Sequence, residues 1–148
     1  MIARFARCSS GAAAVEAALV MPILILLGLC SADAGAMMLD AHKMKSGVAT
    51  SARMLARART PATVETEARN LAVTGQRTGG TARVRGWTTG GVTVSYRNEA
   101  NGGLYNGSGP VRIVRVEGIL NYTGFSLLRM AGVTSPVVRV AQEERWIG

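Results

Sequence analysis

An uncharged apolar run near the N-terminus constrains this chain most strongly. Between Glu16 and Asp33 lie sixteen residues, 17–32, without a charged side chain. The wider apolar segment from Ala12 to Leu39 has 28 residues. As a helix it is about 42 Å long, which exceeds a bilayer hydrocarbon core of about 30 Å. We therefore expect one membrane-spanning helix, with Glu16 and Asp33 near the membrane faces or neutralised by partners.

The residues before this run have the composition of a targeting leader. Residues 1–11 are short, basic and polar. A secretory signal is an alternative, because Ala32-Asp33-Ala34 offers a small-residue cleavage site. Two features oppose it: the apolar sequence continues beyond this site, and Glu16 stands at the start of the run. The basic residues on the two sides of the run are equal in number, so the positive-inside rule gives no orientation.

The remaining sequence predicts an α+β fold. Helical spacing of apolar residues continues to Leu55, so the membrane helix is expected to extend into the domain. Thr60-Pro61 predicts the start of a second helix, with Thr60 as its cap, and Gly75 predicts its end. From Gln76 onward, Gly-Gly pairs and alternating apolar residues predict three or four antiparallel strands. The alternating residues form three groups: Val92, Val94 and Tyr96; Val114, Val116, Leu120 and Tyr122; and Val138 and Val140.

Three regions follow from this pattern. We expect a leader over residues 1–11, the transmembrane helix and its extension over 12–59, and an extracytoplasmic α+β domain over 60–148. Residues 124–132 are expected to be an apolar connection between strands. A fragment beginning near Ser46 is expected to be soluble, with a circular dichroism spectrum of mixed helix and strand.

The charge of the chain is strongly positive. Its 148 residues allow one domain at most and carry a formal charge of +8. Beyond Ser46, thirteen arginines stand against six glutamates. Such a field attracts nucleic acid, acidic polysaccharide or anionic lipid. The arginines are scattered, however, and no zinc spacing, helix-turn-helix signal or aromatic stacking motif accompanies them, so nucleic acid is not an expected partner.

Catalytic, cofactor and metal sites are not expected. The single histidine, His42, has no cysteine or second histidine near it, and neither Cys8 nor Cys30 lies in the distal domain. Glu143-Glu144 resembles a solvated strand end more than an acid–base pair. The glycine pairs lack the Gly-Lys-Ser/Thr of a phosphate loop and are interpreted as turns. We therefore do not expect an enzyme.

The most informative motif joins the leader to the apolar helix. The segment from Gly11 to Pro22 is GAAAVEAALVMP, in which Gly-x-x-x-Val-Glu is followed by a proline six residues after Glu16. This pattern resembles prepilins and pseudopilins, and most closely the TadE-like pseudopilins of the tight-adherence (Tad or Flp) type IV pilus system. Other shared features are Asp33, the segments 51–59 and 68–75, and Arg145. The family usually has Phe or Tyr where this chain has Ala17.

The resemblance implies a processing site, an assembly residue and a set of partners. In such proteins a membrane peptidase cuts after the glycine that ends the leader, which corresponds to the Gly11–Ala12 bond. Glu16 then corresponds to the assembly glutamate. The implied partners are a prepilin peptidase, a sister pseudopilin, the major pilin and the pilus assembly platform in the inner membrane. The implied role is that of a minor pilin-like subunit for pilus assembly and surface attachment.

Elementary electrostatics gives Glu16 a reason to have a partner. A carboxylate at the edge of an apolar helix is costly unless it is paired. Cleavage after Gly11 creates an α-amino group at Ala12, about one helical turn away on the same chain or on a neighbour. Alternatively, Glu16 lies among the lipid headgroups without a specific partner. For the whole chain, the alternative is a membrane-tethered or secreted basic domain that binds anionic glycan, DNA or lipid.

Overall fold

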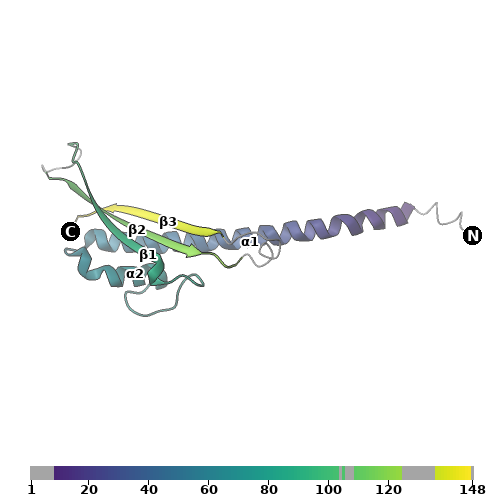
Figure 1. Ribbon diagram of the computed structural model, residues 1–148, viewed down its shortest axis with the longest axis horizontal. Helices are drawn as coiled ribbons and strands as arrows, with labels where there is room; N and C mark the ends of the chain where they lie inside the picture. Colours follow the sequence, from purple (N-terminus) through teal and green to yellow (C-terminus); the bar gives the residue numbers. More distant parts are fainter. Residues whose placement is uncertain (1–8, 104, 106–108, 125–135, 148) are drawn as a thin grey trace, which may run out of the picture.

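The computed structural model describes residues 9–103, 105, 109–124 and 136–147. Its architecture is a rod-like N-terminal helix followed by a small α+β domain (Figure 1), which confirms the predicted fold class. The elements in chain order are α1 (Ser9–Arg57), the 3₁₀ turn η2 (Pro61–Val64), α2 (Glu65–Thr74), the 3₁₀ turn η3 (Thr89–Gly91), β1 (Val92–Glu99), β2 (Val111–Asn121) and β3 (Val137–Arg145).

Helix α1 has two parts with different surroundings. It contains 49 residues and is about 74 Å long at 1.5 Å per residue. In its first half large apolar side chains are uncovered, with Leu19 69% and Ile23 66% exposed. In its second half Met44, Val48 and Leu55 are fully buried. The expected extension of the apolar helix into the domain is therefore confirmed, and Figure 1 shows the sheet and α2 gathered along this second half.

The sheet has the order β1-β2-β3 and is antiparallel. Because side chains alternate across a strand, Val114, Val116 and Leu120 of β2 share one face, and all three are buried. This face packs on α1, and the alternating pattern had predicted the strands. The three strands correspond to the three predicted groups. Of the connection expected over residues 124–132, residues 125–132 lie outside the described residues.

Helices α1 and α2 approach each other closely at small residues. A Cβ atom at Gly47 would collide with the backbone carbonyl oxygen of Ala72. One turn further along α1, the buried Ser51 hydroxyl donates a hydrogen bond of 2.8 Å to the carbonyl oxygen of Ala68. The lack of a side chain at Gly47 therefore allows the two helices to approach closely. The Ser51 hydroxyl, buried between them, is satisfied by its hydrogen bond.

The start of the second helix differs from the prediction. The Thr60 side chain does not cap a helix; its Oγ1 lies 3.0 Å from the Oγ1 of Thr63. The Thr63 amide donates to the Thr60 carbonyl at 3.1 Å, which forms a 3₁₀ turn, and α2 begins only at Glu65. The predicted end is confirmed. Gly75 has φ 83° and donates its amide to the carbonyl oxygen of Leu71 at 2.9 Å, the left-handed cap that favours glycine.

Two tryptophans attach the loop and the C-terminal tail to this framework. Trp87, in the loop before β1, is 1% exposed and is the largest fully buried side chain. Trp146 follows β3, and its Nε1 donates to the carbonyl oxygen of Ala58 at 2.8 Å, while the amide of Ile147 donates to that of Ala56 at 2.8 Å. The tail thus satisfies one carbonyl in the last turn of α1, which the helix itself leaves unpaired, and one just after the helix.

The burial of α1 changes the expected boundary of an independently folding fragment. A fragment beginning at Ser46 lacks Met44, which is fully buried, and also Met37 and Ala41, which pack against the core. Because removing a buried methionine side chain costs about 2–5 kcal/mol, we expect fragment 36–148 to be more stable than fragment 46–148 by at least about 2 kcal/mol. Urea unfolding followed by circular dichroism measures this difference. Met44→Ala in the longer fragment should remove most of it, and equal unfolding midpoints for the two fragments would contradict this account of the core.

Candidate functional site

The residues of the predicted processing and assembly site lie together at the start of α1. Gly11 is exposed, and a Cβ atom built on it meets nothing within 4 Å. Glu16 is also exposed and forms no ion pair within the described residues. Ala12 and Glu16 are four residues apart in one helix and are therefore neighbours on its surface. Gly11 and the carboxylate of Glu16 are both accessible to another molecule.

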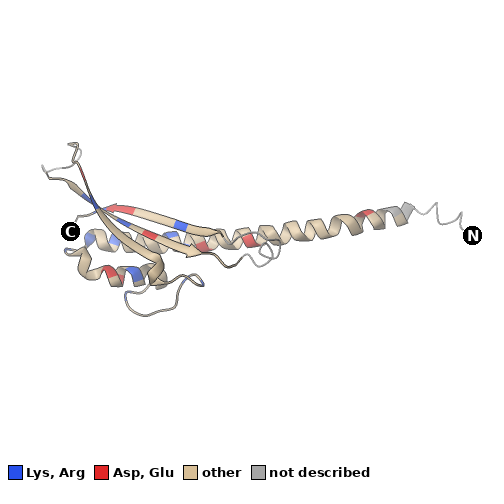
Figure 2. Ribbon diagram, in the orientation of Figure 1, with Lys and Arg blue, Asp and Glu red and all other residues tan. Residues whose placement is uncertain are grey.

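This site begins a long uncovered apolar surface. Figure 2 shows no coloured charge on α1 between Glu16 and Asp33. The helix is long and apolar enough to cross a membrane, and none of the most apolar stretch is buried within the protein. Apolar surface of this extent requires a lipid or protein environment.

Asp33 marks the place where the free part of α1 meets the domain. It is half-buried, and its Oδ2 atom is buried without a hydrogen-bond partner in the part of the chain that the structure describes. The charge of Asp33 affects Tyr122, which lies just after β2. Burial raises the pKa of the Tyr122 phenol, and the charges of Asp40 and Asp33 raise it further. The carboxylate that ends the apolar run therefore lies close enough to the domain to affect one of its side chains.

The outer face of the sheet carries an alternating chain of ion pairs, which we call the charge ladder. Glu143 of β3 accepts hydrogen bonds of 2.9 Å from both Arg97 and Arg115. Glu117 of β2 pairs with Arg115 at 3.6 Å and with Arg139 at 3.3 Å. The complete ladder is Glu99, Arg97, Glu143, Arg115, Glu117 and Arg139. The three arginines and three glutamates of the ladder balance each other's charge.

The ladder corrects one prediction made from the sequence. Glu143 is not a solvated strand end, because its side chain is only 32% exposed and stands directly opposite Arg115 in the register. The hydrogen bond to Glu143 raises the pKa of the Arg115 guanidinium. The repeated Arg-x-Glu spacing in Arg97-Glu99 and Arg115-Glu117 could have suggested same-face pairs. The pairing across strands follows only from the register.

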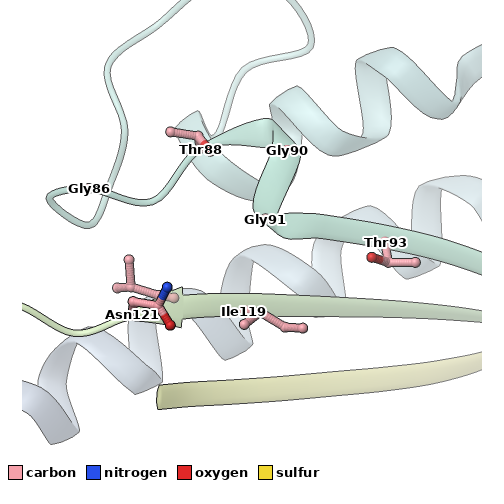
Figure 3. Close-up of a pocket in the computed structure, with 8 residues that line it drawn as sticks. Gly86, Thr88, Gly90, Gly91, Thr93, Ile119 and Asn121 are labelled. Carbon is pink, nitrogen blue, oxygen red and sulfur yellow. The ribbon is translucent and has the colours of Figure 1, made fainter. Parts of the chain in front are cut away.

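A hollow of about 380 Å³ lies between the loop around Gly86 and the end of β2 (Figure 3). Its polar side chains are Thr88, Thr93 and Asn121, and the other residues that line it are glycines, Ile119 and Leu120. None of these side chains can act as a general acid or base near neutral pH. Within the described residues, no group of three or more His, Cys, Asp or Glu side chains could hold a metal ion.

Comparison with known protein families finds a match to the N-terminal part of the chain. Residues 11–53 match the model of the TadE-like protein family. The match begins at Gly11 and continues into the buried half of α1, so it includes the whole motif from Gly11 to Pro22. It confirms the resemblance inferred from that motif. Comparisons with curated proteins and with solved structures gave no match.

Proposed function

We propose that this chain is a minor pilin-like (pseudopilin) subunit that takes part in assembly of a Tad pilus and in surface attachment. The observation that carries the proposal is the coincidence of the family match with the free helix. The match begins at Gly11, where α1 is exposed, and runs along the apolar half that the domain leaves uncovered. A helix that is free at one end and held in a domain at the other suits a subunit that is stored in a membrane and then packed among other helices.

The proposed topology follows from the two halves of α1. Its free half anchors the protein as a single-pass subunit in the bacterial cytoplasmic membrane, after removal of the leader, residues 1–11. The α+β domain over residues 60–148 then lies outside that membrane. The proposed partners are a prepilin peptidase, a sister pseudopilin, the major pilin and the assembly platform. The exposed carboxylate of Glu16 is proposed to pair with the α-amino group of Ala12, on its own chain or on a neighbour, because an unpaired charge beside an apolar helix is costly.

The outer face of the sheet gives no support to the alternative, a membrane-tethered or secreted basic domain that binds anionic glycan, DNA or lipid. The charge ladder pairs each of its three arginines with a glutamate on the outer face. Paired charges attract a polyanion less than free ones do, because the carboxylate competes for the guanidinium.

Replacement of the leader glycine tests the proposed processing. Gly11→Leu places a bulky side chain at the cleaved bond, and we expect it to abolish removal of the leader. Mass spectrometry of the full-length protein from its own host should then show the precursor instead of a chain that begins at Ala12. Gly28→Leu is a matched control, because Gly28 also has open space around its Cβ position, and it should be processed normally.

The mature N-terminus separates the competing interpretations. A start at Ala12 in the unmodified protein supports the pseudopilin proposal. A start at Gly35 indicates a secretory signal, and an intact Met1 indicates an unprocessed anchor. Either of these last two results, or normal processing of Gly11→Leu, contradicts the proposed peptidase site.

A further inference from the structure

A groove between α1 and α2 combines an apolar floor with basic walls. It encloses about 570 Å³, and its floor includes Met54, Val64 and Leu71. Arg53 and Arg57 of α1 line one side, and Arg77, from the loop after α2, also lines it. The two α1 arginines are four residues apart and so lie on one face of that helix. Three arginines thus line the same groove as these aliphatic side chains.

The positive charge of this groove is only partly neutralised. Arg53 makes one contact, of 3.7 Å, with the Glu144 carboxylate, and its side chain remains 66% exposed. Arg57 and Arg77 form no ion pair within the residues that the structure describes. The contact with Glu144 shows that a carboxylate can approach Arg53 at the side of the groove. The groove differs in this respect from the outer face of the sheet, where the charges of the ladder cancel.

Position and composition exclude several occupants. Arg53 lies twenty residues beyond Asp33, so the groove begins about 30 Å along α1 from the end of the apolar run, out of reach of lipid headgroups at that end. Five glutamates of the domain already pair with arginines of the same chain, so a second copy offers no cluster of free carboxylates among its described residues. Among the described residues, those that line the groove include no aromatic side chain on which a nucleic-acid base could stack.

We propose that this groove docks an acidic segment of a partner protein, with carboxylates on the arginines and aliphatic side chains on the floor. Arginine binds carboxylates through paired hydrogen bonds, and Met54, Val64 and Leu71 supply the apolar contact. The inference goes beyond the proposed function and does not depend on it, because it rests only on the groove between α1 and α2. Failure of leader processing would leave it standing.

A binding experiment with a defined probe tests the groove. The probe is a fluorescently labelled helical peptide of about fourteen residues with glutamates on one face and leucines on the other, measured by anisotropy against the full-length protein in an uncharged detergent. We expect saturable binding that weakens with salt. Arg77→Glu should raise Kd at least about tenfold, equivalent to 1.4 kcal/mol, and Arg57→Glu should act in the same direction. Circular dichroism checks that each variant is folded, and Arg77→Gln provides a milder variant.

Matched controls distinguish docking from a general attraction between opposite charges. Arg85→Glu changes the net charge equally at an exposed loop residue outside the groove, and it should change Kd by less than about twofold. A peptide with serine in place of leucine should bind more weakly than the probe. The proposal is overturned by absence of saturable binding, by an equal effect of Arg85→Glu, or by equal binding of the serine peptide. Tighter, Arg77-dependent binding of a heparin oligosaccharide or of duplex DNA would also overturn it.

Discussion

Replacing Trp87 with alanine is expected to lower the free energy of unfolding of the domain by about 3–5 kcal/mol. Trp87 is 1% exposed and fills the space above Gly118, whose Cβ atom, if present, would lie 2.9 Å from Cζ2 of the indole. Truncation therefore leaves a large cavity between the loop, the sheet and α1. Because domains are stable by only about 5–15 kcal/mol in total, this single change removes a large share of the stability. Urea unfolding of fragment 36–148, followed by far-ultraviolet circular dichroism, measures it.

The indole nitrogen of Trp87 supplies a sharper comparison. Its Nε1 is buried without a hydrogen-bond partner in the described part of the chain, and such a group costs about 1–3 kcal/mol. Trp87→Phe loses some apolar area but removes this unpaired donor, so we expect it to cost less than half as much as Trp87→Ala. Val137→Ala, at a position that is 55% exposed, should change stability by less than about 0.5–1 kcal/mol. Equal losses for the phenylalanine and alanine variants would contradict the cavity explanation.

Loss of the Glu16 charge is expected to abolish piliation while leaving cleavage and membrane insertion intact. Glu16→Gln keeps the shape and hydrogen-bonding capacity of the side chain but removes its charge. Glu16→Leu removes both and makes α1 a better membrane span. If the carboxylate pairs with the α-amino group of Ala12, both variants should accumulate as mature, membrane-bound protein that does not support pili. Electron microscopy counts the pili, and immunoblots of membrane fractions measure the mature protein.

A conservative variant separates charge from general disturbance of the helix. Glu16→Asp keeps the charge with a shorter side chain and should support more piliation than Glu16→Gln. Ser31→Ala provides a control elsewhere on α1, since within the described residues its hydroxyl donates a hydrogen bond of 2.8 Å to the Leu27 carbonyl of its own helix. Normal pili in both Glu16→Gln and Glu16→Leu would show that Glu16 is an interfacial residue without a pairing role.

The elements that were predicted well depend on neighbours in the chain. The buried positions Met44, Val48 and Leu55 follow a helical period, so the extension of α1 was visible before the structure was known. Gly75 ends α2 in the left-handed conformation that glycine favours. This preference belongs to a single residue, so the sequence alone reveals it. The start of α2 was misjudged for a related reason. Thr60 and Pro61 are typical of the start of a capped helix. They are equally compatible with a turn in which the Thr63 amide donates to the Thr60 carbonyl.

The functional sites likewise include one that could be predicted from the sequence and one that could not. Gly11, Ala12 and Glu16 lie within six residues of one helix, so their grouping followed directly from the sequence, and the structure adds that Gly11 and Glu16 are exposed. The groove could not be predicted, because its walls come from α1 and from the loop after α2. Only the packing of α2 on α1, at the close contact of Gly47 with Ala72, brings Arg77 and the α1 arginines to the same groove.

The sequence alone determined that an apolar helix would leave its first half uncovered and continue into an α+β domain, because helical and strand periods are local properties of the backbone. Only the tertiary structure decided where the charges of that domain meet. Arg97 and Glu143 are 46 residues apart, and their contact requires the register of both strand pairs, in which a shift of one residue moves every side chain to the other face. The arginines that indicate a basic domain in the sequence therefore fall into different surroundings: those of the charge ladder are paired with glutamates, whereas Arg57 and Arg77 of the groove form no ion pair within the described residues.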